Sequence, residues 1–321
     1  MNENEILEKL AKVFTYYSKD VIKGPGDDCA VIDLGDKKNF YLFTVDEMVE
    51  GTHFILDFLK PQEVASRLVR ANVSDIYSMG DATPLYCLVS AGLNKEKVND
   101  KWISLFTKSL KKELDFFGVK NIGGNLSRSR NIYFSMTVIG KANKKKILMR
   151  SGAKKGDLIC AIGFMGSSKA AAEIMLLRKR ENISMIEESL IRDFTSPMIY
   201  KRECSKISKF ASAMLDNSDG LYKSALILAK TNNLRAIIDY NTLDFFVSVN
   251  LKKWCDINSK DPRKYVLFGG EDYNLIFSVP KRKFADLKKE VRNVKVIGEF
   301  VEGKGVYCSG YVGKIENFEH F

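Results

Sequence analysis

The sequence predicts an α/β or α+β protein made of two domains. Strand and helix patterns alternate in both halves of the chain, which is typical of sheets covered by helices. The 321 residues suffice for two domains of ordinary size, and a hydrophobic content of 45% lets each bury its own core. A polar, basic stretch at 143–146 and 150–156 separates the halves. We therefore expect an N-terminal domain at 1–145 and a C-terminal domain at 146–321.

Turn and cap residues delimit the elements of the first half. A Gly35-Asp36 turn separates two runs rich in β-branched and aromatic residues. Pro61 is a favoured first residue of a helix, and Gly118 follows an amphipathic stretch as a helix stop. The predicted strands are 29–34, 40–45, 85–93 and 132–139, and the predicted helices are 61–80 and 100–117.

The second half repeats the alternation. A glycine-containing turn at 163–166 leads from its first strand into its first helix. The predicted strands are 158–162, 213–215, 236–240, 273–279 and 294–297, and the predicted helices are 168–180, 221–230 and 281–289.

Composition narrows the class of protein. The net charge of +11 has two interpretations, an anionic partner or a Lys-rich solvated surface, and the short lysine runs favour the second. The six cysteines are scattered singly and there are two histidines, which argues against a zinc site or a disulfide framework. The chain starts acidic and polar, and it has no apolar run of about 18 residues. We expect a cytoplasmic protein that does not associate with membranes.

Aspartates at the ends of predicted elements are the main functional signal. They are Asp27, Asp28, Asp46, Asp75, Asp216 and Asp219. Carboxylates that gather in space repel one another unless cations lie between them, and sets of oxygen ligands suit Mg²⁺. Taken singly, each aspartate also has an ordinary explanation as a turn or cap residue. Convergence of the set would indicate a magnesium site that binds phosphates.

Asp75 is unusual because of its position on a predicted helix. Leu68, Asn72, Asp75 and Met79 form one stripe, so the acid lies in line with apolar neighbours. A bound metal would remove the cost of burying its charge, while hydrogen bonding to Asn72 or solvation is the alternative.

A Gly123-Gly124-Asn125 segment lies between a predicted helix and a predicted strand. Two glycines let backbone N–H groups approach phosphate oxygens, although an ordinary loop would also explain them. The sequence contains neither GxxxxGK[ST] nor a GxGxxG after a strand, so a P-loop and a Rossmann or kinase-type glycine loop are excluded.

Read together, these segments resemble the thiamine-monophosphate kinase family, within the superfamily of aminoimidazole ribonucleotide synthetase and selenophosphate synthetase. The matching stretches are GDDCA at 26–30, Asp46 through GTHF at 51–54, NVSD at 72–75 with MG at 79–80, GGN at 123–125, RSGAKKGD at 150–157, DNSDGL at 216–221, FGGEDY at 268–273 and FEHF at 318–321. They occur in the family's order and span nearly the whole chain.

The resemblance implies a fold, a reaction and a dimer. It implies an N-terminal mixed sheet with helices on one side and a C-terminal α/β layer that closes over the site. Two copies would pair through their sheets into a homodimer, with nucleotide sites near the interface. The enzyme would transfer the γ-phosphoryl group of ATP to thiamine monophosphate by Mg²⁺-assisted in-line transfer, giving thiamine diphosphate and ADP, with no acid–base residue required.

The resemblance also implies the site residues. The metal ligands would be Asp28, Thr44, Val45, Asp46, Asp75, Asn125, Asp216 and Asp219. ATP would contact Gly124, Asn125, Arg150 and Ser218, and thiamine monophosphate would contact His53, Glu271 and Phe318. Val45 replaces a frequent Thr, so only its carbonyl could serve. Asn125 and Phe318 also depart from the residues that some members have.

Two other functions remain open from the sequence. The first is another ATP-dependent synthetase of the same superfamily, which differs in the small molecule that stimulates ATP turnover. The second is a protein without catalytic activity that binds nucleic acid through its positive charge, although Arg–aromatic interleaving is absent.

Overall fold

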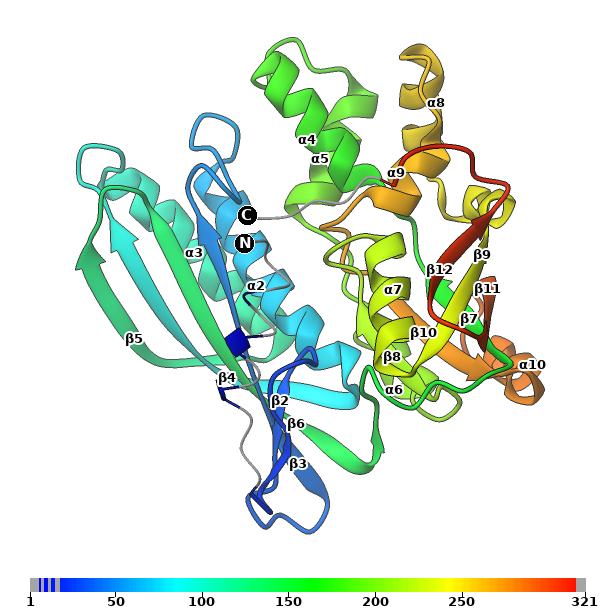
Figure 1. Ribbon diagram of the computed structural model, residues 1–321. Helices are drawn as coiled ribbons and strands as arrows, with labels where there is room; N and C mark the ends of the chain where they lie inside the picture. Colours follow the sequence, from blue (N-terminus) through cyan, green and yellow to red (C-terminus); the bar gives the residue numbers. More distant parts are fainter. Residues whose placement is uncertain (1–5, 7–8, 11–12, 15–17, 316–321) are drawn as a thin grey trace.

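The computed structural model describes residues 6, 9–10, 13–14 and 18–315. It contains two six-stranded sheets, the first built from the N-terminal half and the second from the C-terminal half (Figure 1). In each sheet one pair of strands is parallel and the others are antiparallel. The predicted α/β or α+β fold is therefore confirmed in its α+β form.

The first sheet has helices on one face. Its strands are β1 (Val21–Lys23), β2 (Ala30–Ile32), β3 (Asn39–Val49), β4 (Gly80–Leu93), β5 (Lys120–Arg128) and β6 (Tyr133–Ile147). Their order is β1-β2-β3-β6-β4-β5, with β4 and β5 parallel. Helix α2 (Pro61–Ser78) packs on β3, β4 and β6, and α3 (Asp100–Phe117) packs on α2. The expected mixed sheet with helices on one side is confirmed.

The second sheet lies among the remaining helices. Its strands are β7 (Asp157–Ile162), β8 (Ala213–Asp216), β9 (Leu234–Asp239), β10 (Leu275–Pro280), β11 (Val294–Glu302) and β12 (Gly305–Ser309), in the order β12-β9-β11-β7-β10-β8. The helices are α4 (Ser167–Arg178), α5 (Met185–Thr195), α6 (Glu203–Ile207), α7 (Leu221–Thr231), α8 (Val249–Ile257), α9 (Pro262–Phe268) and α10 (Lys281–Glu290), with the 3-10 helix η1 (Tyr240–Phe246).

Local sequence signals placed the long helices α2 and α3 correctly, but they made the long strands β3, β4 and β6 too short, at 40–45, 85–93 and 132–139. Pro61 begins α2 as its first residue, and Gly118 ends α3 in the left-handed conformation with a φ of 73°. The sequence did not predict β1, β5, β12, α5, α6, α8 or α9.

Two expectations about loops were wrong. The Gly123-Gly124-Asn125 segment lies within β5 rather than in a loop, and all nine residues of that strand are exposed. Because β5 is an edge strand with no buried face, it shows no alternation of apolar and polar residues. The basic run 143–146 is not a linker but continues β6 to Ile147, where it pairs with β3 and β4.

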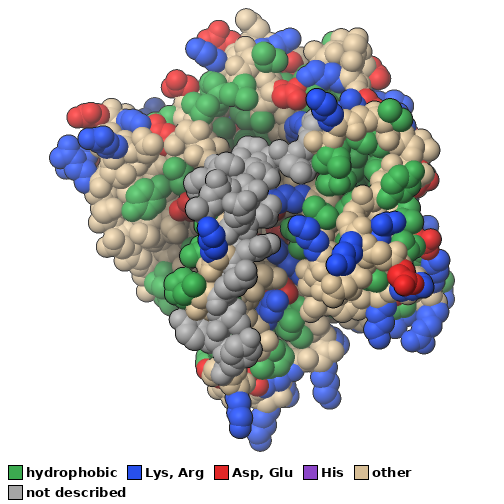
Figure 2. All heavy atoms as spheres, in the orientation of Figure 1, with side chains coloured by type: hydrophobic (Ala, Val, Ile, Leu, Met, Phe, Trp, Pro, Cys, Tyr) green, Lys and Arg blue, Asp and Glu red, His purple; other side chains and the backbone are tan. Residues whose placement is uncertain are grey.

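The two halves pack against each other along α2. This helix contacts β8 and α5 of the second half, and one apolar core joins residues of both halves, such as Leu68 and Leu190. The division at 145/146 stays a prediction. Within the described ranges, no helix combines the length and apolar character that crossing a bilayer requires. On the face in Figure 2, Lys and Arg side chains are spread over both halves, which does not favour a nucleic-acid-binding surface.

Candidate functional site

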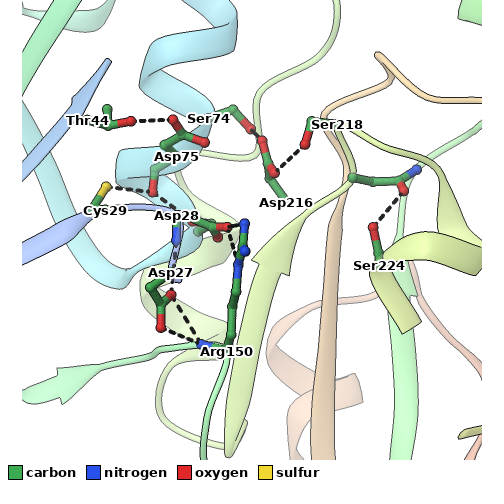
Figure 3. Close-up of polar contacts among 12 residues, drawn as sticks. Asp27, Asp28, Cys29, Thr44, Ser74, Asp75, Arg150, Asp216, Ser218 and Ser224 are labelled. Atoms are coloured by element: carbon green, nitrogen blue, oxygen red, sulfur yellow. Dashed lines mark hydrogen bonds and ion pairs between the residues drawn. The ribbon is translucent and has the colours of Figure 1, made fainter. Parts of the chain in front are cut away.

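Acidic side chains from both halves of the chain converge beside α2 (Figure 3). Asp28 lies shortly before β2, Asp46 lies on β3 and Asp75 lies near the end of α2. Asp216 is the last residue of β8, and a short loop leads from it to α7. Pairing of β2 with β3 and packing of α2 on both β3 and β8 bring the four together.

Strand β3 directs two of its side chains into the site. Thr44 and Asp46 lie on the face that α2 covers, and Val45 points to the opposite face, where 60% of it is exposed. Val45 can therefore offer the site only its carbonyl, as expected. The strand was expected to end at residue 45 but continues to Val49, so Asp46 lies within it.

Hydrogen bonds fix the orientation of the acids. Thr44 Oγ1 donates to Asp75 Oδ2 at 2.5 Å, and the main-chain N–H of Asp46 donates to Asn72 Oδ1 at 2.9 Å. Asp216 accepts from Ser74 Oγ at 2.7 Å and from Ser218 Oγ at 3.2 Å (Figure 3). The hydrogen bond between Asp75 and Asn72, which was one alternative to a metal site, does not form. Asn72 Nδ2 donates to the carbonyl of Leu68, and Asn72 Oδ1 accepts from the main-chain N–H of Asp46.

Arg150 is the cation of the cluster. Its Nε and Nη2 lie 2.8 and 2.6 Å from Asp28 Oδ1, and its main-chain N–H donates to both carboxylate oxygens of Asp27 at 3.2 and 3.1 Å (Figure 3). From the sequence, Asp27 has no assigned role. The structure shows that it anchors the Arg150 backbone and lines the pocket.

Burial and mutual repulsion perturb the carboxyl groups. Desolvation, followed by the charges of Asp28 and other neighbouring acids, raises the pKa of Asp46 to about 6. The same causes, opposed by the Ser74 hydrogen bond and Arg150, raise the pKa of Asp216 to about 8. Burial and then the charges of Asp46 and Asp216 raise the pKa of Asp75 well above its usual value. Arg150 alone therefore does not neutralise the cluster.

The donor set fits hard divalent cations. It consists of carboxylate oxygens and the Thr44 hydroxyl, and within the described part of the chain the buried Asp28 Oδ2 accepts no hydrogen bond. Among the described residues, no three Asp, Glu, His or Cys side chains form a ready-made cage for one ion. Phosphate oxygens and water would have to complete the coordination, as is usual for Mg²⁺ bound with a nucleotide.

A pocket of about 290 Å³ opens over these acids. It brings together ten of the predicted site residues: Asp28, Thr44, Val45, Asp46, His53, Asp75, Arg150, Ser218, Asp219 and Glu271. The pocket is also lined by Asp27, named above only as one of the aspartates, and by four residues to which the sequence assigned no role: Glu47, Met48, Ala71 and Tyr273. Asp216 lies beneath Ser218, to which it is hydrogen-bonded.

Glu271 is presented by an unusual loop. Its backbone is left-handed, with a φ of 64°, and its N–H donates to the carbonyl of Ser218 at 2.7 Å. Gly270 is required here because a Cβ would lie 2.5 Å from the same carbonyl. The Glu271 carboxylate forms an ion pair with Arg67 of α2, a residue that the sequence analysis did not single out.

Two predicted residues are not brought to this pocket. Gly124 and Asn125 lie on β5, separated from β3 by β6 and β4 in the sheet. Phe318 lies outside the described residues. His53 does line the pocket, and its Nδ1 accepts a 3.1 Å hydrogen bond from the main-chain N–H of Val49, which leaves the proton of a neutral ring on Nε2.

Comparisons with known proteins identify the family of this chain. Residues 26–142 match the family described as AIR synthase related protein, N-terminal domain. The thiamine-monophosphate kinase of Aquifex aeolicus is 32% identical over 299 residues, covering 92% of each chain. That of Pyrococcus horikoshii is 30% identical over 307 residues, covering 96% of this chain and 91% of its own.

A solved structure is similar over the full length. AaThiL complexed with AMPPCP and TMP superposes with a TM-score of 0.88 at 30% identity, covering 100% of this chain and 97% of that one. This chain therefore belongs to the thiamine-monophosphate kinase family.

Proposed function

We propose that this protein transfers the γ-phosphoryl group of ATP to thiamine monophosphate, forming thiamine diphosphate and ADP. The observation that carries the proposal is the convergence of Asp28, Asp46, Asp75 and Asp216 at the edge of one pocket, in a member of this family. AaThiL, which is similar to this chain, was solved with AMPPCP and TMP. AMPPCP is an ATP analogue, so that complex supports an ATP-dependent reaction.

Magnesium is the cation that suits the acidic cluster. Its ligands would be Asp28, Thr44, the carbonyl of Val45, Asp46, Asp75, Asn125, Asp216 and Asp219. Bound Mg²⁺ would offset the repulsion between the two anionic phosphates that must approach each other. The protein's own part is to hold these oxygens in place, through Thr44, Ser74 and Asn72, before the substrates bind.

The two substrates would occupy different ends of the pocket. Arg150 and Ser218 would bind ATP phosphates beside Asp28 and Asp216. His53, Glu271 and the aromatic ring of Phe318 would bind thiamine monophosphate, whose acceptor phosphate is already ionised. No strong general base is then required, and positioning with charge neutralisation supplies the catalysis.

The enzyme would act as a homodimer formed through the first sheet. The face of this sheet opposite α2 and the strand β5 carry exposed apolar side chains, among them Val45, Tyr86, Leu88, Ile122 and Leu126. A second pocket of about 310 Å³, lined by Asp28, Phe43, Thr44, Val45 and Thr137, opens beside this face. A second copy that covers it could bring its own Gly124 and Asn125 to the site.

We place the enzyme in the cytoplasm, which the free thiols of all six cysteines support. The test of the proposed function is an end-point assay for thiamine diphosphate with and without Mg²⁺. We expect product and ADP only when ATP, thiamine monophosphate and Mg²⁺ are all present. Well-folded protein that forms no thiamine diphosphate would contradict the proposal. ATP turnover that responds to a different small molecule would instead support another synthetase of the superfamily.

A further inference from the structure

Arg67 is a buried cation that connects the first half of the chain to the Glu271 loop. Its Nη2 forms the ion pair with Glu271, and its Nη1 donates to the carbonyl of Phe194 at 2.7 Å. Its Cζ lies 3.7 Å from the centroid of the Phe194 ring. The Arg67 side chain is 1% exposed and that of Glu271 is 38% exposed. A fixed cation therefore holds a carboxylate that is open to the pocket.

Glu271 is held at both its backbone and its side chain. The main-chain N–H of Glu271 donates to the carbonyl of Ser218, which lies in the loop between β8 and α7 and is proposed to bind ATP. The side chain is tied to α2 by Arg67 and also accepts a hydrogen bond from the hydroxyl of Tyr273 at 3.3 Å. A left-handed backbone at a residue other than glycine persists only when its surroundings hold it. The ion pair fixes where the carboxylate points.

Helix α2 sets the separation between the two ends of the pocket. Arg67, Ala71 and Asp75 lie at a spacing of four residues and share one face, and Ala71 and Asp75 line the pocket. At 1.5 Å per residue, eight residues place Arg67 about 12 Å along the axis from Asp75. Strand β3 runs antiparallel to α2 here, because Thr44 contacts Asp75 while Asp46 contacts Asn72. The Arg67 end is therefore the end of Met48 and His53.

We propose that Arg67 is a positioning residue for the acceptor substrate. Through Arg67, α2 holds the Glu271 carboxylate at a fixed distance from the acids around Asp75. A molecule with a phosphate at one end and a cationic ring at the other could place its phosphate among the proposed Mg²⁺ ligands around Asp75 and its ring beside the Glu271 carboxylate. This inference rests on the proposed function, since the thiazolium ring of thiamine monophosphate supplies that cation.

The chemistry of Arg67 suits this role. A guanidinium stays charged when it is buried and can direct separate N–H groups to two acceptors, here the Phe194 carbonyl and Glu271. The Glu271 carboxylate is thereby prevented from rotating toward solvent. Without Arg67, the carboxylate would lose its preferred direction, and the binding of the cationic ring would weaken while the nucleotide side would be unaffected.

The test compares Arg67→Met with a matched control, Arg70→Met. Arg70 is also on α2, is ion-paired with Glu113 at 2.9 Å and donates to the carbonyl of Pro197 at 2.7 Å, but it does not line the pocket. We expect Arg67→Met to raise the KM and the Kd for thiamine monophosphate about tenfold, which corresponds to about 1.4 kcal/mol. The KM for ATP should change less than about twofold, and Arg70→Met should change neither constant by more than this.

A double-mutant cycle with Glu271→Gln separates positioning from general destabilisation. If Arg67 acts through Glu271, Arg67→Met adds little to the loss of affinity in a Glu271→Gln background. If Arg67→Met does not fold, Arg67→Lys provides the comparison, because it keeps the buried charge but cannot fork between two acceptors. We expect about a threefold rise in KM for thiamine monophosphate from Arg67→Lys, with the KM for ATP unchanged.

The possible outcomes distinguish the two proposals. Folded Arg67 variants with an unchanged affinity for thiamine monophosphate, or an effect that is additive with Glu271→Gln, would overturn the role of Arg67. A wild-type protein that binds thiamine monophosphate in a calorimetric titration but does not phosphorylate it would contradict the proposed function alone. A wild-type protein that does not bind it would contradict both.

Discussion

Ser74 Oγ donates a 2.7 Å hydrogen bond to Asp216 Oδ2, and this contact joins α2 of the first half to β8 of the second. Asp216 is buried, and the hydrogen bond opposes the rise in its pKa that burial causes. The acids of the site are therefore held across the boundary between the two halves. Their geometry depends on how α2 and β8 pack.

Ser74→Ala should weaken the binding of Mg²⁺ without unfolding the protein. The loss of this hydrogen bond removes an orienting contact and lets the pKa of Asp216 rise further above about 8. Removing such a supporting contact costs about 10- to 100-fold in metal affinity. The check is the apparent Mg²⁺ activation constant at about pH 7, and an unchanged constant would show that Ser74 is dispensable.

Asp75→Asn should lose most activity while the protein stays folded. The substitution removes a proposed metal ligand, but it also removes a buried carboxyl group whose ionised form is disfavoured by desolvation and by the neighbouring acids. We therefore expect a Tm, measured without Mg²⁺ at about pH 8, that is equal to or above that of the wild type. Asp115→Asn is the matched control because Asp115 is an exposed acid paired with Lys111 on α3. An unaffected rate for Asp75→Asn would remove Asp75 from the site.

Stability without Mg²⁺ should fall as the pH rises from about 4 to about 8. In the folded state the pKa is about 6 for Asp46 and about 8 for Asp216, against a usual value of 3.8. The folded protein therefore binds more protons than the unfolded chain in this window, so raising the pH favours unfolding. Because Mg²⁺ would bind the ionised acids, the increase in Tm that it causes should grow across the same window. Thermal unfolding at several pH values, with Mg²⁺ and with EDTA, checks this, and a constant increase in Tm would contradict it.

Leu126→Asp should disrupt the proposed dimer and its activity together. Leu126 lies on β5 and is 69% exposed. When a second copy covers this face, an aspartate at this position would be buried as an unpaired charge, which is unfavourable. Leu177→Asp provides the control, because Leu177 is 79% exposed but lies on α4 of the second half. Light scattering would measure the mass of each variant. A Leu126→Asp protein that stays dimeric and active would show that the interface lies elsewhere.

Local sequence patterns predicted the elements whose signals lie in consecutive residues. Helix α3 shows this, since its apolar spacing and Gly118 define both its face and its end. Strand β5 shows the opposite case, because an exposed edge strand with two glycines has the composition of a loop and is recognised only through its pairing with β4. The role of Asp27 could not be assigned from the sequence because it depends on Arg150, which is 123 residues away.

The sequence by itself determined that the chain is α/β or α+β, and it determined the family and the aspartates that would hold metal, because each of these is encoded in local patterns, short motifs and their order. Only the tertiary structure decided which groups meet in one pocket. It brought Arg67 to Glu271 and Ser74 to Asp216, and it left Gly124 and Asn125 separated from β3 by two intervening strands. The physical reason is that these contacts depend on how α2 packs between the two sheets, and packing of elements distant in sequence leaves no local pattern in the chain.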